Sequence, residues 1–401
     1  MKIGYLVPEF PGQTHAFFWR EILALEARGH HVEIFSTRPP PTKLKSHAWT
    51  EHAVGRTTYL SDVSKAGIAA LGGRALTKLH KVSIKSADIR DLSDAKDLFA
   101  TLVFGLRLGE LMRSLGVKHV HTHSCARSAL IALFAKQFCG TTYSITLHGF
   151  LKDYGSLQRL KWRNAAFATI ITREIRDETL QDLAGDLPPE IKLQPMGVDT
   201  TKFTRREPYQ PWRPGKPFEV FCCARLNRVK GHITLLEAVR KLTSEGLDIR
   251  LTIAGEDDLG GDGYRKVIEQ AIVDLEISDR VALMGAVSED VVLDRLTNSH
   301  VFALASHREP LGVAYMEAMS CDTPVIGTDA GGVPELIENE VDGLLIAPKD
   351  PEQLAGALRK IADNPDFAGK LADAGRRKVE HHFSADRGAE TLIEAISTLY
   401  E

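Results

Sequence analysis

The pattern of apolar and polar positions predicts a strand, a helix and a second strand at the start of the chain. An apolar run over residues 3–7 predicts a buried strand, and residues 8–14 form a loop after it. Apolar positions at helical spacing predict a helix over 16–28, which Gly29 ends ahead of a strand at 31–35. Strands joined through a helix lie parallel in one sheet, so this segment is a βαβ unit.

The same order of elements returns in the second half of the chain. A strand is predicted at 218–223, a loop at 225–231, a helix at 233–242 and a strand at 249–254. A chain of 401 residues is too long for one ordinary hydrophobic core. We therefore expect an α/β protein with two Rossmann-like, doubly wound domains.

A proline-rich segment predicts where the two domains are joined. Residues 207–217 contain four prolines, which do not fit a helix or a central strand. We expect an N-terminal domain over 1–206, a linker at 207–217, a C-terminal domain over 218–383 and a final helical segment at 384–401. After residue 350 the pattern is helical, with a helix start or a break expected at Pro351, Pro365 and Phe383.

Composition and charge indicate an ordinary globular protein. Hydrophobic residues make up 43% and charged residues 26%, and the net charge of −3 gives no reason to expect a nucleic-acid partner. The five cysteines form no C-x-x-C pair, which favours free thiols in a reducing compartment. The first residues turn polar too early for a signal peptide, and no apolar run reaches about 18 residues. We expect a cytoplasmic protein.

Two glutamates follow a predicted strand at 301–304. Pro310 suits the first turn of a helix, so Glu309 is expected at the junction of strand and helix, and Glu317 about two turns further. Carboxylates accept paired hydrogen bonds from sugar hydroxyls, and free N–H groups at a helix start favour a phosphate or sugar oxygen. The residues that carry those N–H groups are Leu311, Gly312 and Val313. The alternative is an acidic helix start that caps its own backbone.

Cations and glycines accompany the two glutamates. Arg225 and Lys230 follow the strand at 218–223, at the sheet edge where ligands of open α/β sheets bind. Their alternative interpretation is solvated loop charge. A second strand and a loop with Gly331-Gly332 lie over 325–335, and paired glycines allow a ligand to approach the backbone closely.

Two candidates lie in the first half. His148 ends a predicted strand at 143–147, where it is placed to bond a sugar hydroxyl or to stabilise charge at a reacting carbon. The alternative is an ordinary loop histidine. Gly12 follows the first strand and would let phosphates approach. The chain has no G-x-G-x-x-G motif, which argues against an NAD enzyme.

Together these segments resemble the retaining GT-B glycosyltransferases of glycosyltransferase family 4. The resemblance is densest over 220–348 and includes the 225–230 loop, the segment 309–317 and Gly331-Gly332. Residues 14–22 resemble exopolysaccharide-type members, with His15 in place of a common acidic residue. That half normally shapes the acceptor site, so this departure leaves the acceptor open.

The resemblance implies a role for each candidate. Glu309 would hold hydroxyls of the donor sugar and Glu317 the ribose, while Arg225 and Lys230 neutralise the departing diphosphate. Backbone near Val287 would meet the base, and His148 would lie near the transferred sugar. The donor would be a UDP or GDP sugar, and the last helix would cross back to the N-terminal domain.

The expected reaction is a hexosyl transfer with retention at the anomeric carbon, without metal or other cofactor. We find no covalent nucleophile and favour a front-face departure assisted by the leaving phosphate. His119, His121 and His123 alternate along one strand, as zinc ligands would, but a packed strand explains them better. The acceptor is expected to be a sugar, a growing polysaccharide or a lipid-linked saccharide.

Four basic residues recur at helical spacing: Arg74, Lys78, Lys81 and Lys85. A basic helix stripe would dock the protein on anionic lipid at the inner face of the membrane. The alternative, which we favour, is a solvated helix face. Rival functions on a related architecture are a nucleotide-sugar epimerase, a sugar phosphorylase and a non-catalytic nucleotide-sugar-binding protein.

Overall fold

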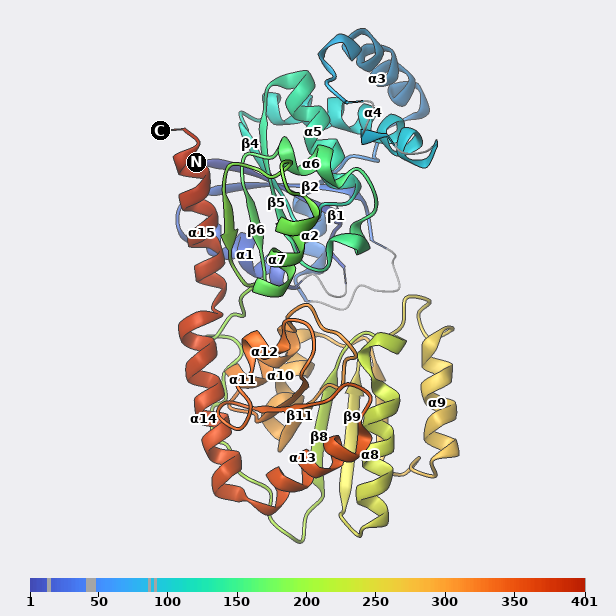
Figure 1. Ribbon diagram of the computed structural model, residues 1–401, viewed down its shortest axis with the longest axis vertical. Helices are drawn as coiled ribbons and strands as arrows, with labels where there is room; N and C mark the ends of the chain where they lie inside the picture. The colour runs from blue at the N-terminus through green and yellow to red at the C-terminus, as the bar shows by residue number, and fades with distance from the viewer. Residues whose placement is uncertain (13–15, 41–47, 86–87, 90–91, 401) are drawn as a thin grey trace. The chain divides into compact units, whose positions relative to one another are not determined.

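The computed structural model describes residues 1–12, 16–40, 48–85, 88–89 and 92–400, which form two compact units (Figure 1). Apart from Ala48, which groups with the second unit, the first unit runs to Pro195 and also includes the chain from Gly388 onward. The second unit runs from Met196 to Arg387. The change of unit therefore precedes the proline-rich segment 207–217. That segment has no helix or strand, and the Tyr209 hydroxyl donates to the His300 carbonyl at 2.7 Å, within the second unit.

The first unit is built on a seven-stranded sheet in which all pairs are parallel. Its strand order is β3-β2-β1-β4-β5-β6-β7. The strands are β1 (Lys2–Glu9), β2 (His31–Arg38), β3 (Thr57–Tyr59), β4 (His119–Thr122), β5 (Thr142–Leu147), β6 (Ala168–Ile170) and β7 (Ile191–Leu193). The predicted first βαβ unit is confirmed, and parallel pairing follows because each connection is long enough to cross the sheet.

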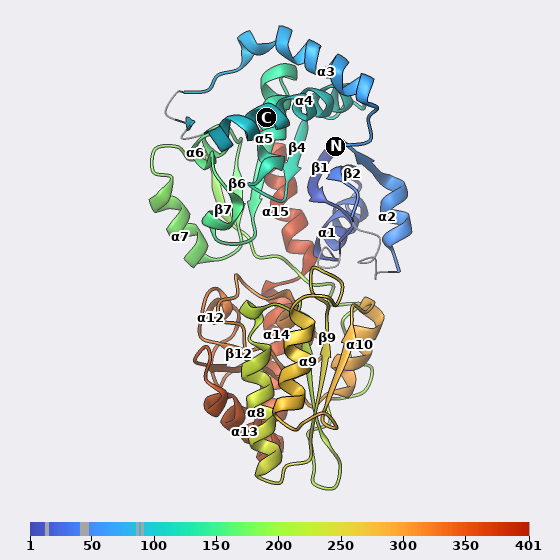
Figure 2. The same cartoon turned by 90° about the vertical axis from the view of Figure 1, so that its right-hand side faces the viewer.

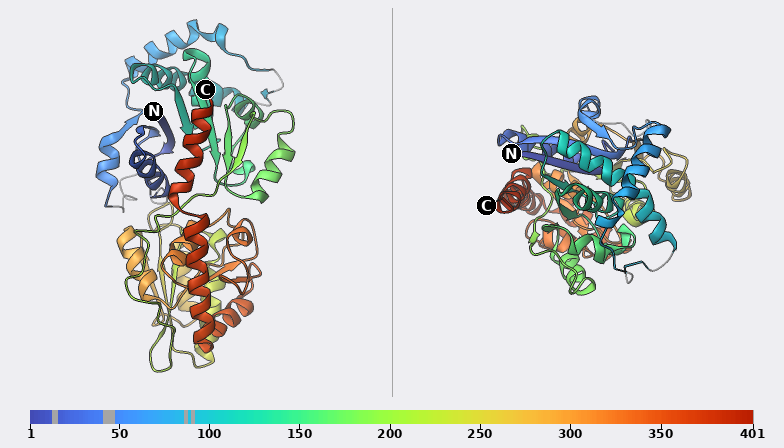
Figure 3. Two further views of the ribbon diagram at one scale, coloured as in Figure 1. Left: turned by 90° about the vertical axis from the view of Figure 1, so that its left-hand side faces the viewer. Right: turned by 90° about the horizontal axis from the view of Figure 1, so that it is seen from above.

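Helices cover both faces of this sheet. On one face lie α1 (Ala16–Ala27) and the last helix, α15 (Ala385–Thr398), as Figure 3 shows. On the other, α5 (Arg127–Cys139) contacts β1, β4 and β5 and carries α4 (Leu92–Ser114) on its outer side. Further helices in the described residues of this unit are α2 (Thr50–Arg56), α3 (Lys65–Thr77), η2 (Leu79–Lys81), η4 (Leu151–Tyr154), α6 (Gln158–Arg163) and α7 (Arg173–Asp182).

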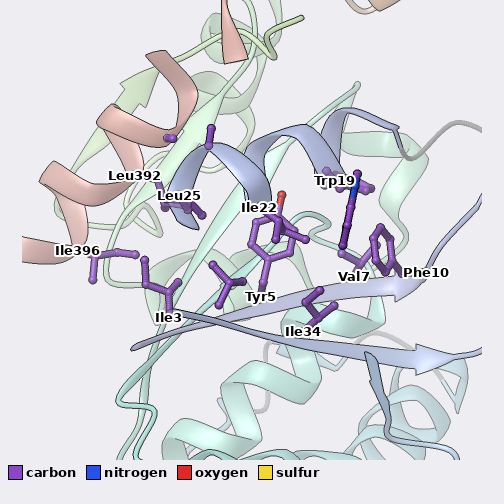
Figure 4. Close-up of a cluster of buried hydrophobic side chains, with 14 of the residues drawn as sticks. Ile3, Tyr5, Val7, Phe10, Trp19, Ile22, Leu25, Ile34, Leu392 and Ile396 are labelled. Atoms are coloured by element: carbon purple, nitrogen blue, oxygen red, sulfur yellow. The ribbon is translucent and has the colours of Figure 1, made fainter. Parts of the chain in front are cut away.

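The end of the chain completes the core of the first unit. Leu392 and Ile396 of α15 pack with Ile3 of β1 and with Ile22 and Leu25 of α1, and all five side chains are buried (Figure 4). Burial of such a side chain stabilises a fold by about 1.5–3 kcal/mol. The first unit therefore depends on residues that the chain supplies last.

The second unit has a six-stranded parallel sheet of order β10-β9-β8-β11-β12-β13. Its strands are β8 (Phe218–Cys223), β9 (Ile249–Ala254), β10 (Val281–Gly285), β11 (Val301–Ala303), β12 (Val325–Thr328) and β13 (Leu344–Ile346). The predicted strands at 218–223 and 249–254 are confirmed at both ends.

The helices of the second unit form two layers, with α8 and α9 drawn in front of the sheet in Figure 2. α8 packs on β9 and on α13, whereas α10 packs on β8 and α11 on β12 and α14. Their bounds are η5 (Arg228–Lys230), α8 (His232–Ser244), α9 (Tyr264–Asp274), α10 (Glu289–Asn298), α11 (Val313–Ser320), α12 (Val333–Leu336), α13 (Pro351–Asp363) and α14 (Pro365–His382).

Each sheet has one point where the strand order reverses. In the first sheet it lies between β1 and β4, and in the second between β8 and β11. Connections leave in opposite directions at such a point, which opens a crevice at the carboxyl ends of the strands where ligands bind. The loops after these four strands are therefore where a functional site is expected.

The predicted basic helix stripe is wrong. α3 ends at Thr77, so Arg74 alone of the four basic residues lies within that helix. Lys78 is the C-cap of α3, Lys81 lies in η2 and Lys85 lies in irregular chain. Arg74 also pairs with Glu110 of α4 at 2.8 Å. The four side chains thus belong to one segment but not to one helix face.

Two further expectations concern thiols and the membrane. All five cysteines are free; Cys125, Cys222 and Cys321 are buried, and Cys139 and Cys223 are half-buried. In the described part of the chain, no helix combines the length and the apolar character needed to cross a membrane.

Candidate functional site

Three loops meet at the carboxyl ends of β8, β11 and β12. The backbone N–H of His307, after β11, donates to the Val229 carbonyl in the loop after β8, at 2.7 Å. The N–H of Gly332, after β12, donates to the Glu309 carbonyl at 2.9 Å. The loop after β11 is therefore held from both sides at the order reversal of the second sheet.

Two glycines allow this close approach. Gly231 and Gly331 have φ angles of +67° and +66°, where a side chain is strained. A Cβ atom at Gly231 would lie 1.8 Å from the Ala305 carbonyl oxygen, and one at Gly331 would lie 2.2 Å from that of Glu309. Both positions therefore require glycine.

The loops bring Lys230 and Glu309 together. The Lys230 ammonium donates to Oε2 of Glu309 at 2.5 Å, and the Ser306 hydroxyl donates to the same oxygen at 3.0 Å. The side chains are only 19% and 9% exposed, so the pair is largely screened from water. A carboxylate has about four lone-pair sites, which leaves Glu309 able to accept further hydrogen bonds.

The charges of this site also act on neighbouring groups. Burial raises the pKa of the Cys222 thiol to about 12, and Lys230 opposes that shift. Burial and then the Glu317 carboxylate raise the pKa of Cys223, whereas burial and then Glu309 raise that of Tyr315. The charges of Glu309, Glu317 and Lys230 are therefore close enough to shift the pKa of side chains packed at the end of β8.

The helix that follows Glu309 starts later than predicted. α11 begins at Val313, with Gly312 as its N-cap at a φ angle of +99°, so Pro310 precedes the helix instead of opening it. Glu317 is consequently in the second turn and not after two full turns. Leu311 is buried ahead of the helix start. The start of the helix, and with it the first N–H groups that the helix leaves without an internal partner, therefore moves to Val313 and Ala314.

The remaining candidates of the second unit lie around this core. Arg225 follows β8; its side chain is 45% exposed and lies 3.7 Å from Asp258. Asn227 caps η5 by accepting from the Lys230 N–H at 3.2 Å, which orders the loop that carries the ammonium group. Val287 is half-buried after β10, next to Ser288, the N-cap of α10.

In the first unit, His148 directly follows β5 and is half-buried. Its Nε2 lies 3.0 Å from Nδ1 of His123, whose Nε2 lies 3.0 Å from the Glu21 carboxylate. Gly12 follows β1 and is also half-buried. Residues 13–15, which include the His15 of the exopolysaccharide-type segment, lie outside the described residues.

His119 and His121 are packed side chains of β4, the interpretation that we favoured over zinc ligands. Each ring bonds two hydroxyls of β5: His119 contacts Thr142 and Ser144, and His121 contacts Ser144 and Thr146, at 2.7–2.8 Å. Burial lowers the pKa of His119 to about 3, so its ring is neutral at pH 7. Where the structure describes the chain, no cluster of three or more metal-binding side chains occurs.

Comparison with known proteins decides the family. Residues 205–378 match the family model described as glycosyl transferases group 1. The amylovoran biosynthesis glycosyltransferase AmsK of Erwinia amylovora is 30% identical over 438 residues, which cover 100% of both chains. The chain belongs to the group 1 glycosyl transferases. The putative colanic acid biosynthesis glycosyltransferase WcaL of Escherichia coli K12 is 27% identical to this group 1 glycosyl transferase over 419 residues. The alignment covers 99% of this chain and 100% of WcaL.

Solved structures show the same fold as this group 1 glycosyl transferase. The sucrose-phosphate synthase of Thermosynechococcus elongatus aligns with a TM-score of 0.76 at 20% identity, covering 100% of this chain and 99% of that one. Anabaena HepE in complex with UDP-glucose aligns with a TM-score of 0.76 at 17% identity, covering 99% and 100%. The GT-B fold and the family resemblance are thus confirmed, and the rival functions are not favoured.

Proposed function

We propose that this glycosyltransferase moves a hexosyl group, with retention at the anomeric carbon and without a metal ion, from a nucleoside-diphosphate sugar to a saccharide acceptor. The observation that carries the proposal is the Lys230–Glu309 pair, half-buried at the lysine and buried at the glutamate, at the order reversal of the second sheet. Such a pair offers an acceptor for sugar hydroxyls next to a cation for the diphosphate.

Each candidate then has a place in the reaction. Glu309 holds hydroxyls of the donor sugar, and Glu317 holds the ribose. Lys230 and Arg225 stabilise the negative charge that develops as the diphosphate leaves, which is the task a metal ion has in other enzymes. The start of α11 and the backbone near Val287 contact the donor as well, while Gly12 and His148 of the first unit act on the phosphates and the transferred sugar.

The donor class has support from relatives. HepE is described in complex with UDP-glucose, and a 25% identical relative of Corynebacterium glutamicum is named a GDP-mannose-dependent mannosyltransferase. The names of AmsK and WcaL indicate exopolysaccharide synthesis, so we propose a growing or lipid-linked saccharide as the acceptor. We also propose that the enzyme is located in the cytoplasm, at the inner face of the membrane.

The test is a panel of UDP and GDP sugars, each incubated with the chain, with and without a saccharide acceptor. Acceptor-dependent release of UDP or GDP, unchanged by EDTA, supports the proposal, and NMR of the anomeric proton reports retention. Conversion of the donor without acceptor would indicate an epimerase, and dependence on inorganic phosphate a phosphorylase. Thermal stabilisation by the nucleotide without any turnover would indicate a binding protein.

Replacing Arg225 with Ala is expected to lower the turnover number about 100-fold. Its guanidinium is half exposed and 3.7 Å from Asp258, so its loss should leave the thermal midpoint nearly unchanged. Steady-state kinetics with the best donor measure the effect. Arg240→Ala is the matched control, because Arg240 is a similarly exposed arginine of α8 that pairs with Glu276. Equal turnover of the two variants would contradict the role of Arg225.

Solvation is the interpretation that the spacing alone favours, but the exposed leucines beside these residues lead us to propose that the segment 74–85 contacts anionic lipid. Leu76 and Leu79 are 55% and 44% exposed beside the basic residues, an arrangement in which apolar side chains enter the interface and cations meet phosphates. Liposomes with anionic lipid are expected to sediment the chain, and Lys78→Gln with Lys81→Gln to weaken this. Lys266→Gln with Lys370→Gln, at exposed lysines of the second unit, is the control. Binding that ignores anionic lipid would overturn the proposal.

A further inference from the structure

Three ionisable side chains from separate elements form a connected series at the order reversal of the first sheet. Glu21 comes from α1, His123 directly follows β4, and His148 directly follows β5. Oε2 of Glu21 lies 3.0 Å from Nε2 of His123, and Nδ1 of His123 lies 3.0 Å from Nε2 of His148. His123 therefore connects a carboxylate to the histidine assigned to the transferred sugar.

The central histidine is enclosed by aromatic rings. Its side chain is 2% exposed, with the Tyr5 ring centroid 4.3 Å away and that of Phe18 at 4.8 Å. The Tyr5 hydroxyl donates to the same Oε2 of Glu21 at 2.7 Å, which fixes the carboxylate. In such poorly solvated surroundings, electrostatic coupling between neighbours is stronger than in water.

The contacts also favour one arrangement of protons. The negative charge of Glu21, 3.0 Å from Nε2 of His123, favours a proton on that nitrogen. In a neutral ring Nδ1 is then an acceptor, and it pairs with a proton on Nε2 of His148. This leaves Nδ1 as the acceptor nitrogen of His148.

We propose that Glu21 and His123 are positioning residues that hold the ring of His148, select its tautomer and increase its affinity for a proton. The inference rests on the proposed function, in which His148 acts at the transferred sugar. A proton on His148 would be stabilised through His123 by the negative charge of Glu21. This connected series, the Glu21–His123–His148 relay, therefore sets the pH range in which His148 changes charge.

Two further titratable side chains, Tyr5 and His121, face His123 in the described part of the chain. Tyr5 of β1 stays protonated, because burial and then Glu21 raise its pKa. His121 of β4 lies 4.6 Å from His123 between ring centroids, and burial followed by the neighbouring histidines keeps its pKa well below the ordinary value. Glu21 is thus the negative charge that acts on the two histidines from α1.

The experiment measures the titration of His148 in the full-length chain by NMR of ¹⁵N-labelled histidine rings. The signal is assigned by its loss in His148→Asn. In Glu21→Gln, the midpoint of His148 is expected to fall by about one pH unit, because an opposite charge within a few ångströms favours the protonated form. His123→Gln should lower it similarly, and Glu21→Asp should keep most of the wild-type value.

Glu33→Gln is the matched control, since Glu33 bonds His31 at 2.9 Å on the surface of the same unit. It should leave the His148 midpoint unchanged. With a working donor, Glu21→Gln should lower the turnover number about tenfold and shift the pH profile to lower pH, with little change in the donor KM.

The result that overturns the relay is an unchanged His148 midpoint in folded Glu21→Gln or His123→Gln; if one variant does not fold, the other decides. The titration needs no substrate, so it tests the relay separately from the proposed function. A lowered midpoint in a chain that transfers sugar from no donor would support the relay and overturn the proposed function.

Discussion

Replacing Lys230 with Met is expected to lower the turnover number by a factor of about 100–1,000, because the cation beside the leaving diphosphate is lost. The same change leaves the Glu309 carboxylate, whose side chain is 9% exposed, without its cationic partner, although the Ser306 hydroxyl still donates to it. Breaking a fully buried ion pair in this way costs about 3–5 kcal/mol of stability, and we expect a smaller loss here because Lys230 is partly exposed. The turnover number is measured from released nucleoside diphosphate, and stability from urea unfolding followed by a probe in the second unit.

A double variant separates the two effects. Glu309→Gln combined with Lys230→Met removes both charges, so it should recover much of the lost stability but none of the activity. Lys241→Met is the control and should behave nearly like the wild type, because this partly exposed lysine of α8 forms surface ion pairs with Glu245 and Glu352. Should Lys230→Met keep normal turnover with the preferred donor, the site assigned to the second unit would be wrong.

The regular elements were predictable because their signals are local. Strands β8 and β9 match the predicted ranges at both ends, since each is an apolar run bounded by turn or polar residues. Three helices near the end of the chain begin at or near the predicted positions Pro351, Pro365 and Phe383. Proline fixes φ and donates no N–H, so it marks such boundaries wherever the chain folds.

Predictions failed where a distant contact decides the local backbone. Pro310 suits a helix start, but the carbonyl of Glu309 bonds the loop after β12, and Gly312 turns the chain before α11 can begin. The prediction of the basic stripe failed for a different, local reason. The basic residues over 74–85 recur at helical spacing, and no proline in that range marks the end of α3 at Thr77.

The candidate site was predicted in part. The pairing of Lys230 with Glu309 could be anticipated because both follow strands whose carboxyl ends share one sheet edge. Glu21 and His123 were missed as parts of a site. The alternation of three histidines was visible, but only the position of β4 next to β1 distinguishes His123 from its packed neighbours. The roles of all these residues toward a donor remain predictions.

Replacing Gly331 with Ala is expected to damage the site from a distance. The new Cβ would lie 2.2 Å from the Glu309 carbonyl oxygen, so the loop that carries Glu309 must move by about an ångström, to an ordinary separation. A φ angle of +66° adds about 1–2 kcal/mol of strain for a residue with a side chain. A misplacement of about 1 Å at a reacting group lowers rates by about 100-fold, which is the loss of turnover we expect.

The matched control is Gly356→Ala, the same substitution in α13, where a Cβ would meet no atom within 4 Å. There alanine should leave turnover unchanged and raise stability by about 0.5–1 kcal/mol, because it favours the helix over the unfolded chain. Kinetics and thermal unfolding of the two variants make the comparison. If Gly331→Ala matched the control in both measurements, the loop after β12 would not hold Glu309 in place. A loss of turnover with a smaller loss of stability would show that the packing of these loops serves the position of the carboxylate more than the fold.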